Sequence, residues 1–238
     1  MERILNMNNE GVEYFLAGNY RAAKKSLRTA LMYLKEFHEE CQRLRLLRSI
    51  ENQISLIKDA PHHSFGDLIL QFRRVPDSLN EKSCSQQHYI YRNAIFAFLD
   101  LTQKKGISTP QVQNSSGLAA MIIFNMSLVY HYHAECYNST KNLRNVLSLY
   151  KKSLEALKAA PWFSHKSYNT MVLLGILNNM GAIFYDLAKY KNARDCFKAL
   201  QKMFKTSKDH VVDLEAGAYR GMMMNALFLD QLKTAPVA

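Results

Sequence analysis

The sequence has few residues that interrupt helices, glycine and proline, and few cysteines that could cross-link a small fold. Its 238 residues include only 9 glycines, 5 prolines and 4 cysteines, and 48% of them are hydrophobic. This composition excludes a disordered chain and favours a globular, helical one. No apolar run approaches the ~20 residues that a helix needs to span a bilayer. The opening residues, MERILNMNNEGVEY, lack the apolar core of a signal peptide and are acidic too early for a transit peptide.

Cysteine pairs and catalytic motifs are also missing. The cysteines Cys41, Cys84, Cys136 and Cys196 lie far apart, and no CxxC occurs. We therefore expect free thiols in an intracellular protein, cytoplasmic or nuclear, without a membrane partner. A Gly-rich phosphate loop, GxSxG and HExxH are all absent, so we expect neither an enzyme nor a cofactor.

The eight histidines do not form a metal-binding pattern. His131 and His133 are two residues apart on a predicted helix and point in different directions, whereas helical metal pairs need a spacing of three or four. Cys136 has that spacing from His133, but two ligands do not make a site. We interpret the histidines as ordinary polar or interface residues and expect no metal.

The strongest pattern covers residues 173–205, LLGILNNMGAIFYDLAKYKNARDCFKALQKMFK. It predicts two amphipathic helices joined by a short turn at residues 189–192. The apolar residues that recur three and four apart are Leu177, Met180 and Phe184 in the first helix, and Phe197 and Leu200 in the second. Gly181 and Ala193 have almost no side chain, so the two backbones can approach closely. The remaining apolar surface needs a neighbour, which indicates a hairpin built to be stacked.

This hairpin resembles the tetratricopeptide repeat, a helix–turn–helix unit of 34 residues. With Leu174 as position 1, Gly181 takes the small position 8 and Phe184 the aromatic position 11. Leu200 replaces the usual alanine of position 27, and the proline expected near position 32 is absent. The phrases ILNNMGAIFYDLAKYKNARDCF, IIFNMSLVYHYHAE and YIYRNAI also resemble a large group of repeat proteins best known from diatom genomes, which brings no assigned activity.

Similar units occur elsewhere in the chain. A hairpin at residues 4–37 has Gly11 in the small place, and its second helix continues to about residue 59. A further hairpin at 117–160 has Ser127 in that place, and the hairpin described above extends over 168–207. A last helix at 211–233 matches only the first half of a unit, so we interpret it as the C-terminal cap that repeat arrays require.

An irregular insert at residues 60–116 interrupts the array. Its segments DLILQFRRVP and HYIYRNAIFAF are rich in β-branched and aromatic residues and are flanked by turn-forming stretches. This favours two short extended segments that can pair with each other. The alternative is a degenerate repeat in which HYIYRNAIFAFLDL forms one helix. We predict one all-α domain over residues 1–238, a short irregular tetratricopeptide-like solenoid of helical hairpins with this non-repeat insert.

The resemblance implies a concave groove lined by the first helix of each unit. It places these candidate peptide-binding residues in the groove: Phe124, Asn125, Leu128, His131, Tyr132, Asn178, Asn179 and Tyr185. Asn125 and Asn179 share position 6, where an asparagine can donate to and accept from an extended peptide backbone. The alternative is that each one caps or bridges neighbouring helices inside the fold.

The charge of the chain is strongly basic, with a formal net charge of +11 and a pI near 9.4. Arg21, Lys24, Lys25 and Arg28 cluster on the second helix of the first hairpin. Such an excess favours an acidic protein partner or nucleic acid, although solvated helix faces would give the same composition. We predict a non-catalytic protein–protein interaction scaffold that binds a peptide or helix in its groove. The alternative is an RNA-associated helical-repeat protein that uses its basic surface.

Overall fold

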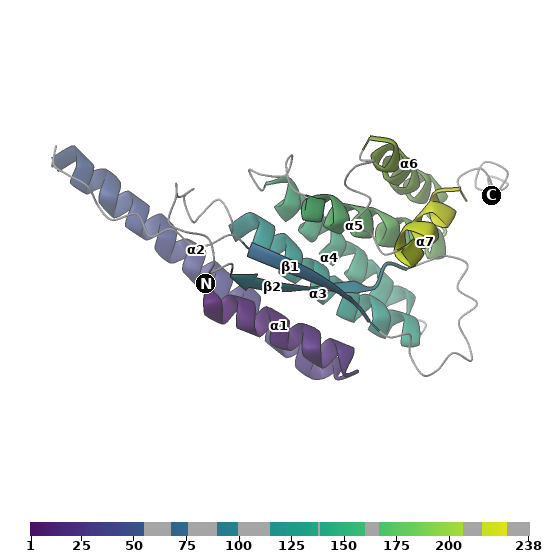
Figure 1. Cartoon of the computed structure of the whole chain (residues 1–238), viewed down its shortest axis with the longest axis horizontal. Coiled ribbons are helices and arrows are strands. Elements are labelled where there is room, and N and C mark those ends of the chain that lie inside the picture. Colours follow the sequence, from purple (N-terminus) through teal and green to yellow (C-terminus); the bar gives the residue numbers. More distant parts are fainter. Residues whose placement is uncertain are drawn as a thin grey trace.

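The structure, a computed structural model, describes residues 1–54, 68–75, 90–99, 115–137, 139–159, 167–206 and 216–227. Its elements in chain order are α1 (Glu2–Leu16), α2 (Tyr20–Ile54), β1 (Leu68–Arg74), β2 (Asn93–Leu99), α3 (Ser115–Cys136), α4 (Thr140–Lys158), α5 (Ser167–Asp186), α6 (Tyr190–Thr206) and α7 (Ala216–Leu227). The predicted all-α fold class with a small extended insert is confirmed (Figure 1). Three predictions fall outside the described residues in whole or in part: the free thiol of Cys84, the continuation of α2 over 55–59, and the two ends of the last helix over 211–215 and 228–233.

The helices pair into three hairpins, α1–α2, α3–α4 and α5–α6, because short turns reverse the chain between them. Gly18 has a φ of 77° in the first turn, a conformation that glycine adopts without a steric penalty. Asn19 then caps α2, its side-chain oxygen accepting from the Ala22 N–H at 3.1 Å. Ser139 caps α4 in the same way, through the Asn142 N–H at 3.3 Å.

Close packing inside each hairpin depends on the small residues of the first helix. A Cβ atom on Gly11 would lie 2.7 Å from Leu27 Cγ, and one on Gly181 would lie 2.5 Å from Phe197 Cε1. Both distances are shorter than real Cβ contacts, so glycine is what lets these large side chains reach the opposite backbone. Ser127 takes the same place in α3, where its hydroxyl is buried and donates to the Ile123 carbonyl oxygen at 2.7 Å.

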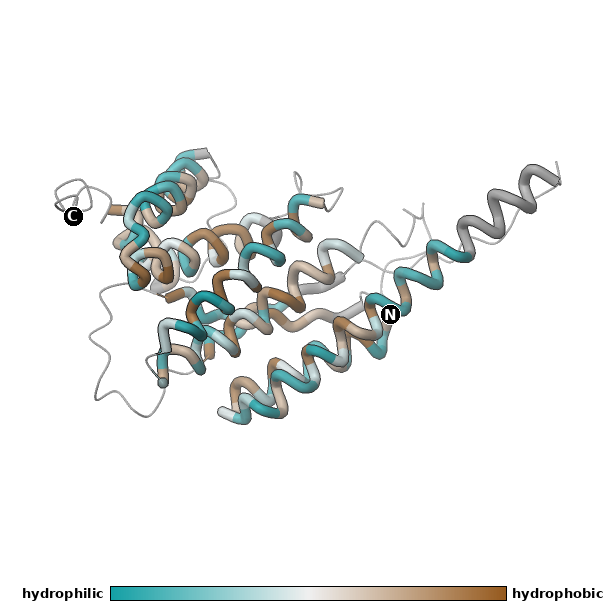
Figure 2. The backbone as a smooth tube through the Cα atoms, turned by 180° about the vertical axis from the view of Figure 1, so that it is seen from behind, coloured by the Kyte–Doolittle hydropathy of each residue, from teal (hydrophilic) through white to brown (hydrophobic). Residues whose placement is uncertain are grey.

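The three hairpins stack on one another and share one hydrophobic core. α2 packs on α3, α4 on α5, and α7 closes the end of the stack against α5 and α6. Figure 2 shows that hydrophobic residues gather along α3 and α5, whereas α2 and α6 are largely hydrophilic. A helix that is apolar on most sides is buried on most sides, so α3 and α5 are the inner helices. No helix in the described part of the chain is long and apolar enough to span a membrane.

The insert contributes a two-stranded antiparallel sheet. β1 pairs with β2 in a register that sets Phe72 opposite Ile95 and Arg73 opposite Ala94. The alternative of one helix over HYIYRNAIFAFLDL is therefore wrong, because residues 93–99 are extended. β2 lies against α1 and α3, on the side of the stack formed by the first helices (Figure 1).

We predict that Gly181→Ala lowers the free energy of unfolding by about 1–3 kcal/mol, because the added methyl group forces Phe197 out of its buried position. Urea denaturation monitored by circular dichroism measures this change. Lys198→Ala, which removes an exposed side chain next to Phe197, is the matched control and should change stability by less than about 0.5 kcal/mol. Equal stability of Gly181→Ala and the native chain would contradict the packing argument.

Candidate functional site

Three asparagines on the first helices bind the backbone of the chain's own inserted segment. Asn9 on α1, Asn125 on α3 and Asn179 on α5 each lie two residues before the small residue of their hairpin, so they occupy equivalent places. Each side-chain amide donates to the carbonyl oxygen and accepts from the N–H of a single residue. The pairs, with donor-to-carbonyl and N–H-to-amide distances, are Asn9 with Ala97 (2.8 and 2.9 Å), Asn125 with Ile95 (2.8 and 2.9 Å) and Asn179 with Tyr91 (2.9 and 2.8 Å).

The bonded residues are those whose backbone groups point away from β1. In an antiparallel pair, successive residues direct their N–H and C=O groups to opposite edges. Arg92 faces β1, since its carbonyl oxygen accepts from the Val75 N–H at 3.0 Å. Tyr91, Ile95 and Ala97 differ from it by an odd number of residues and therefore face the opposite edge. The asparagines, which we call the asparagine ladder, thus take the place of a third strand along that edge.

Burial makes the ladder decisive for the register of β2. Asn125 and Asn179 are fully buried, as are Tyr91, Ile95 and Ala97. A buried backbone group without a partner costs about 1–3 kcal/mol, whereas a neutral hydrogen bond that replaces one to water gains only about 1 kcal/mol. A slip of one residue would leave several such groups unpaired. The main effect of the ladder is therefore to fix the register of the strand, and its contribution to the net stability of the fold is smaller.

A second set of amide contacts joins the helices to one another. Asn125 Nδ2 also donates to Asn8 Oδ1 at 2.9 Å, which links α3 to α1. Asn225 Nδ2 donates to Asn178 Oδ1 at 2.8 Å, and Asn178 Nδ2 donates to Asn179 Oδ1 at 3.0 Å, which links α7 to α5. The same layer of amides therefore holds the chain's own extended segment and bridges neighbouring helices, as the second interpretation of the asparagines expects, and binding of a separate peptide stays a prediction.

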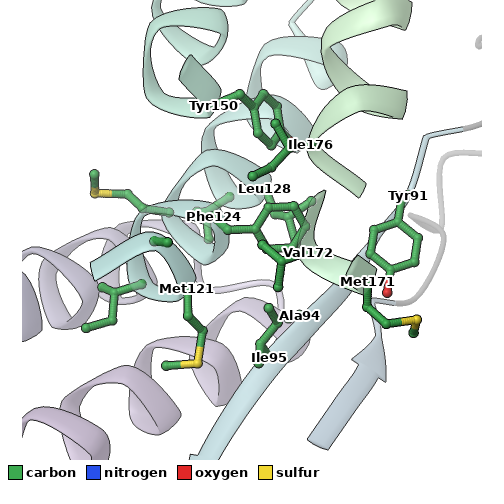
Figure 3. Packing of buried hydrophobic residues seen from close by; sticks show 14 of the residues in the cluster. Tyr91, Ala94, Ile95, Met121, Phe124, Leu128, Tyr150, Met171, Val172 and Ile176 are labelled. Carbon is green, nitrogen blue, oxygen red and sulfur yellow. The ribbon is translucent and has the colours of Figure 1, made fainter. Parts of the chain in front are cut away.

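Side chains of the inserted segment fill pockets between the first helices. Tyr91 lies over Gly175 of α5, where a Cβ atom would come within 2.5 Å of its ring. The ring centroids of Tyr91 and Phe124 are 6.3 Å apart. Figure 3 shows Tyr91, Ala94 and Ile95 in the same buried cluster as Phe124. The absence of a side chain at residue 175 thus creates a pocket for an aromatic ring.

The eight predicted groove residues separate into two sets. Asn125, Asn179, Phe124 and Tyr132 contact the inserted segment; Tyr132 does so through the Arg92 guanidinium, 5.6 Å from its ring centroid. The other four lie among the helices. Leu128 is in the core, Asn178 joins α7, His131 bonds the Tyr150 hydroxyl at 3.3 Å, and Tyr185 packs on Tyr190 in its own hairpin.

Asn9 was missed by the sequence analysis, although a signal for it was present. It stands two residues before Gly11, the same offset that Asn125 has from Ser127 and Asn179 from Gly181. Position 6 of the first hairpin is therefore Asn9, and the repeat pattern was enough to predict it. The occupant of the groove was also missed, because the pairs that hold it are 88, 30 and 88 residues apart in the chain.

Burial keeps two titratable groups beside the asparagine ladder uncharged. His131 is fully buried, and burial, followed by the nearby Arg92 charge, lowers its pKa to about 3. Burial raises the pKa of Tyr150 far above its usual range. Both groups are therefore neutral near pH 7. Among the residues that the structure describes, no three His, Cys, Asp or Glu side chains are grouped to hold a metal ion. The site thus offers neutral amide donors and acceptors beside apolar pockets, together with one largely buried ion pair between Arg92 and Glu135.

Comparisons of the chain with protein-family models, with curated proteins and with solved structures give no match. The contacts of the groove are therefore the basis for a functional proposal.

We predict that Asn125→Ala destabilises the fold by roughly 2–4 kcal/mol, since it leaves the buried N–H of Ile95 without its side-chain acceptor and leaves the Ile95 carbonyl oxygen with the Asn8 amide alone, at 3.1 Å. Amide hydrogen exchange should show the largest loss of protection at Ile95, while Ala94, which faces β1, changes less. Asn192→Ala, at an exposed asparagine on α6, is the control and should leave both amides unchanged. Equal exchange at Ile95 in the native chain and in Asn125→Ala would refute the ladder.

We also predict that His131 makes the fold sensitive to acid. Its folded pKa of about 3 lies below the ordinary value of 6.5, so the folded state binds fewer protons than the unfolded one. The associated stability is complete above pH 6.5 and is lost as the pH falls toward 3, at up to about 1.4 kcal/mol per pH unit. His131→Gln keeps a polar group but cannot titrate, so its stability should fall less steeply between pH 6.5 and 4.5. Urea denaturation at several pH values gives both slopes, and parallel curves would contradict the prediction.

Proposed function

We propose that this protein is a non-catalytic, tetratricopeptide-like scaffold whose groove binds an extended peptide segment by its backbone. The observation that supports the proposal is the asparagine ladder, in which three equivalent side chains each bind both backbone groups of one residue. In the structure, residues 91–97 occupy this site as an internal ligand. A partner segment would replace them and make the same contacts.

The chemistry of the groove defines what it can accept. Backbone amides are common to all sequences, so the ladder itself is tolerant of side chains, as in other modes of strand recognition. Selectivity comes from the pockets: an aromatic residue above Gly175 and, four and six residues later, side chains that fit where Ile95 and Ala97 are buried. We infer a preference for extended segments of the form aromatic-x-x-x-aliphatic-x-small.

An internal ligand also sets a threshold for any partner. A tethered segment competes at an effective concentration that reaches the millimolar range for short flexible tethers. A partner with ordinary affinity therefore binds weakly while β2 is docked, and it binds well once β2 is released or cannot dock. The proposed scaffold is thus self-occupied, and access to its groove is the step at which binding can be controlled.

Two further parts of the proposal rest on the sequence. The absence of the common catalytic motifs supports a protein that is not an enzyme. The scattered cysteines, with no CxxC among them, support a location inside the cell.

The test uses full-length Ile95→Pro, which removes the N–H that Asn125 accepts and prevents β2 from docking. We expect this variant to bind a fluorescent peptide of residues 88–100 at least about a hundredfold more tightly than the native chain does, because the tethered competitor is gone. Fluorescence anisotropy measures both affinities, and circular dichroism checks that the helices remain. If Ile95→Pro loses its helices, Ala97→Pro provides the same test nearer the end of β2.

Two controls isolate backbone recognition. A peptide that carries N-methyl groups at the residues matching Ile95 and Ala97 keeps every side chain but cannot donate to the ladder, so it should not bind. Adding Asn179→Ala to Ile95→Pro should weaken the unmodified peptide. Equal binding of the methylated and unmodified peptides would show that hydrophobic contact alone is responsible, and no binding of either would overturn the proposed function.

A further inference from the structure

Four cations on α2 line an open hollow on the outside of the first hairpin. Arg21, Lys24, Lys25 and Arg28 are three and four residues apart, which places them on one face of the helix. Together with Asn19, Ala22 and Thr29 they surround a hollow of about 670 Å³ that no carboxylate lines. We call this feature the basic hollow. It begins in the first turn of α2, where the positive end of the helix dipole adds to the same potential.

The cations of the basic hollow are not neutralised by the described part of the chain. Within those residues no carboxylate lies within ion-pair distance of any of the four, although other cations have such partners. The pairs with carboxylates are Lys35 with Glu39, Arg43 with Glu40, Arg73 with Glu13 and Arg92 with Glu135. Like charges this close together repel one another, and the pKa of Lys24 is lowered first by burial and then by Arg28. An anion would relieve this repulsion.

Tyr130 of α3 holds two of the cations in place. The Lys24 Nζ atom lies 4.3 Å and the Arg28 guanidinium carbon 5.9 Å from the centroid of its ring. The Arg28 guanidinium also donates to the Tyr130 hydroxyl. The two side chains are therefore oriented before any ligand arrives, which lowers the entropy lost on binding.

The same arrangement recurs along the stack. Lys151 on α4 occupies the position equivalent to Arg28 on α2, and Phe184 on α5 occupies the position equivalent to Tyr130 on α3. The Lys151 Nζ atom lies 5.8 Å from the centroid of the Phe184 ring. Lys198 takes this place on α6, and all three cations are exposed. The outer helices thus carry a row of equivalent cations, which is densest at the basic hollow.

We propose that the basic hollow binds an acidic peptide segment of a partner protein. The Cβ atoms of residues on neighbouring turns of a helix are about 5–6 Å apart, and alternate residues of an extended chain are about 6.6 Å apart along the strand. The two spacings match closely enough for successive side chains to pair. Arginine adds bidentate hydrogen bonds to a carboxylate, and lysine adds charge without demanding one geometry.

Nucleic acid fits the same residues less well. Single-stranded RNA is held by bases that stack on exposed aromatic faces in addition to its phosphates. The aromatic ring at the basic hollow, Tyr130, already has Lys24 over its face. The hollow therefore offers charge without a stacking platform. Because α2 is the outer helix, this site is separate from the asparagine ladder and needs no release of β2.

Fluorescence anisotropy with the full-length protein tests the proposal. The probes are a labelled peptide of four Glu–Ser repeats, its Gln–Ser counterpart and a labelled 12-nucleotide poly-U RNA. We expect the Glu–Ser peptide to bind and to weaken as salt is raised, and we expect the Gln–Ser peptide not to bind. The double variant K24E/R28E should lose about tenfold or more in affinity for the Glu–Ser peptide.

A variant of equal charge separates the site from bulk electrostatics. K141E/K189E changes two exposed lysines at the hairpin turns, so its net charge matches that of K24E/R28E, and its affinity for the Glu–Ser peptide should stay within about twofold of the native value. R21E/K25E, which changes two exposed cations, repeats the test if K24E/R28E does not fold. Equal losses in the hollow and control variants, or no binding of the peptide, would overturn the proposal. Tighter binding of poly-U with the same loss in K24E/R28E would assign the hollow to nucleic acid instead.

Discussion

The hydrogen bonds between the asparagine amides and the outer edge of β2 are the constraint on which the arrangement of this fold depends. A two-stranded sheet is marginal by itself and exposes unpaired backbone groups along both edges. Here one edge of β2 is paired with β1 and the other with Asn9 and Asn125, and Asn179 binds Tyr91 just before the strand begins. A side-chain amide has the same donor and acceptor as a peptide group, so three residues on three helices can complete a strand. This is how an all-α stack accommodates an extended segment in its core.

The ladder also changes how the hairpins depend on one another. In a regular solenoid each unit contacts only its neighbours, and stability is a sum of local terms. Here one segment of the chain bonds to α5 through Tyr91, to α3 through Ile95 and to α1 through Ala97. Loss of the strand would remove partners from three hairpins together, while the amide bridges from Asn8 and Asn178 would still join adjacent helices. The inserted strand therefore couples units that sequence repetition alone would leave independent.

Local spacing was enough to predict the helices, because the contacts that define a hairpin lie within about one repeat. Gly181 and Phe197 illustrate this, since both belong to the same hairpin and the glycine is required by the ring it faces. The extended character of the insert was also visible in its β-branched and aromatic residues. Its position was not, because partners 88 residues apart leave no periodic trace in one sequence. The groove positions transferred from the repeat pattern include Asn125 and Asn179, which bind an extended backbone of the chain itself, and also His131, which is 1% exposed and turned toward Tyr150.

The groove and the basic hollow would recognise a partner through different physics. The groove combines neutral amides and apolar pockets with one largely buried ion pair, so its interactions are short-ranged and depend little on ionic strength. The basic hollow relies on charges at the surface, which act over about 10 Å at moderate salt and mainly raise the rate of encounter. Because the hollow is open and the groove is filled by residues 91–97, an acidic partner would meet the hollow first. If the partner also carries an extended segment, binding of its acidic segment at the hollow raises the local concentration of that extended segment near the groove. A high local concentration is what a segment needs to compete with the tethered residues 91–97.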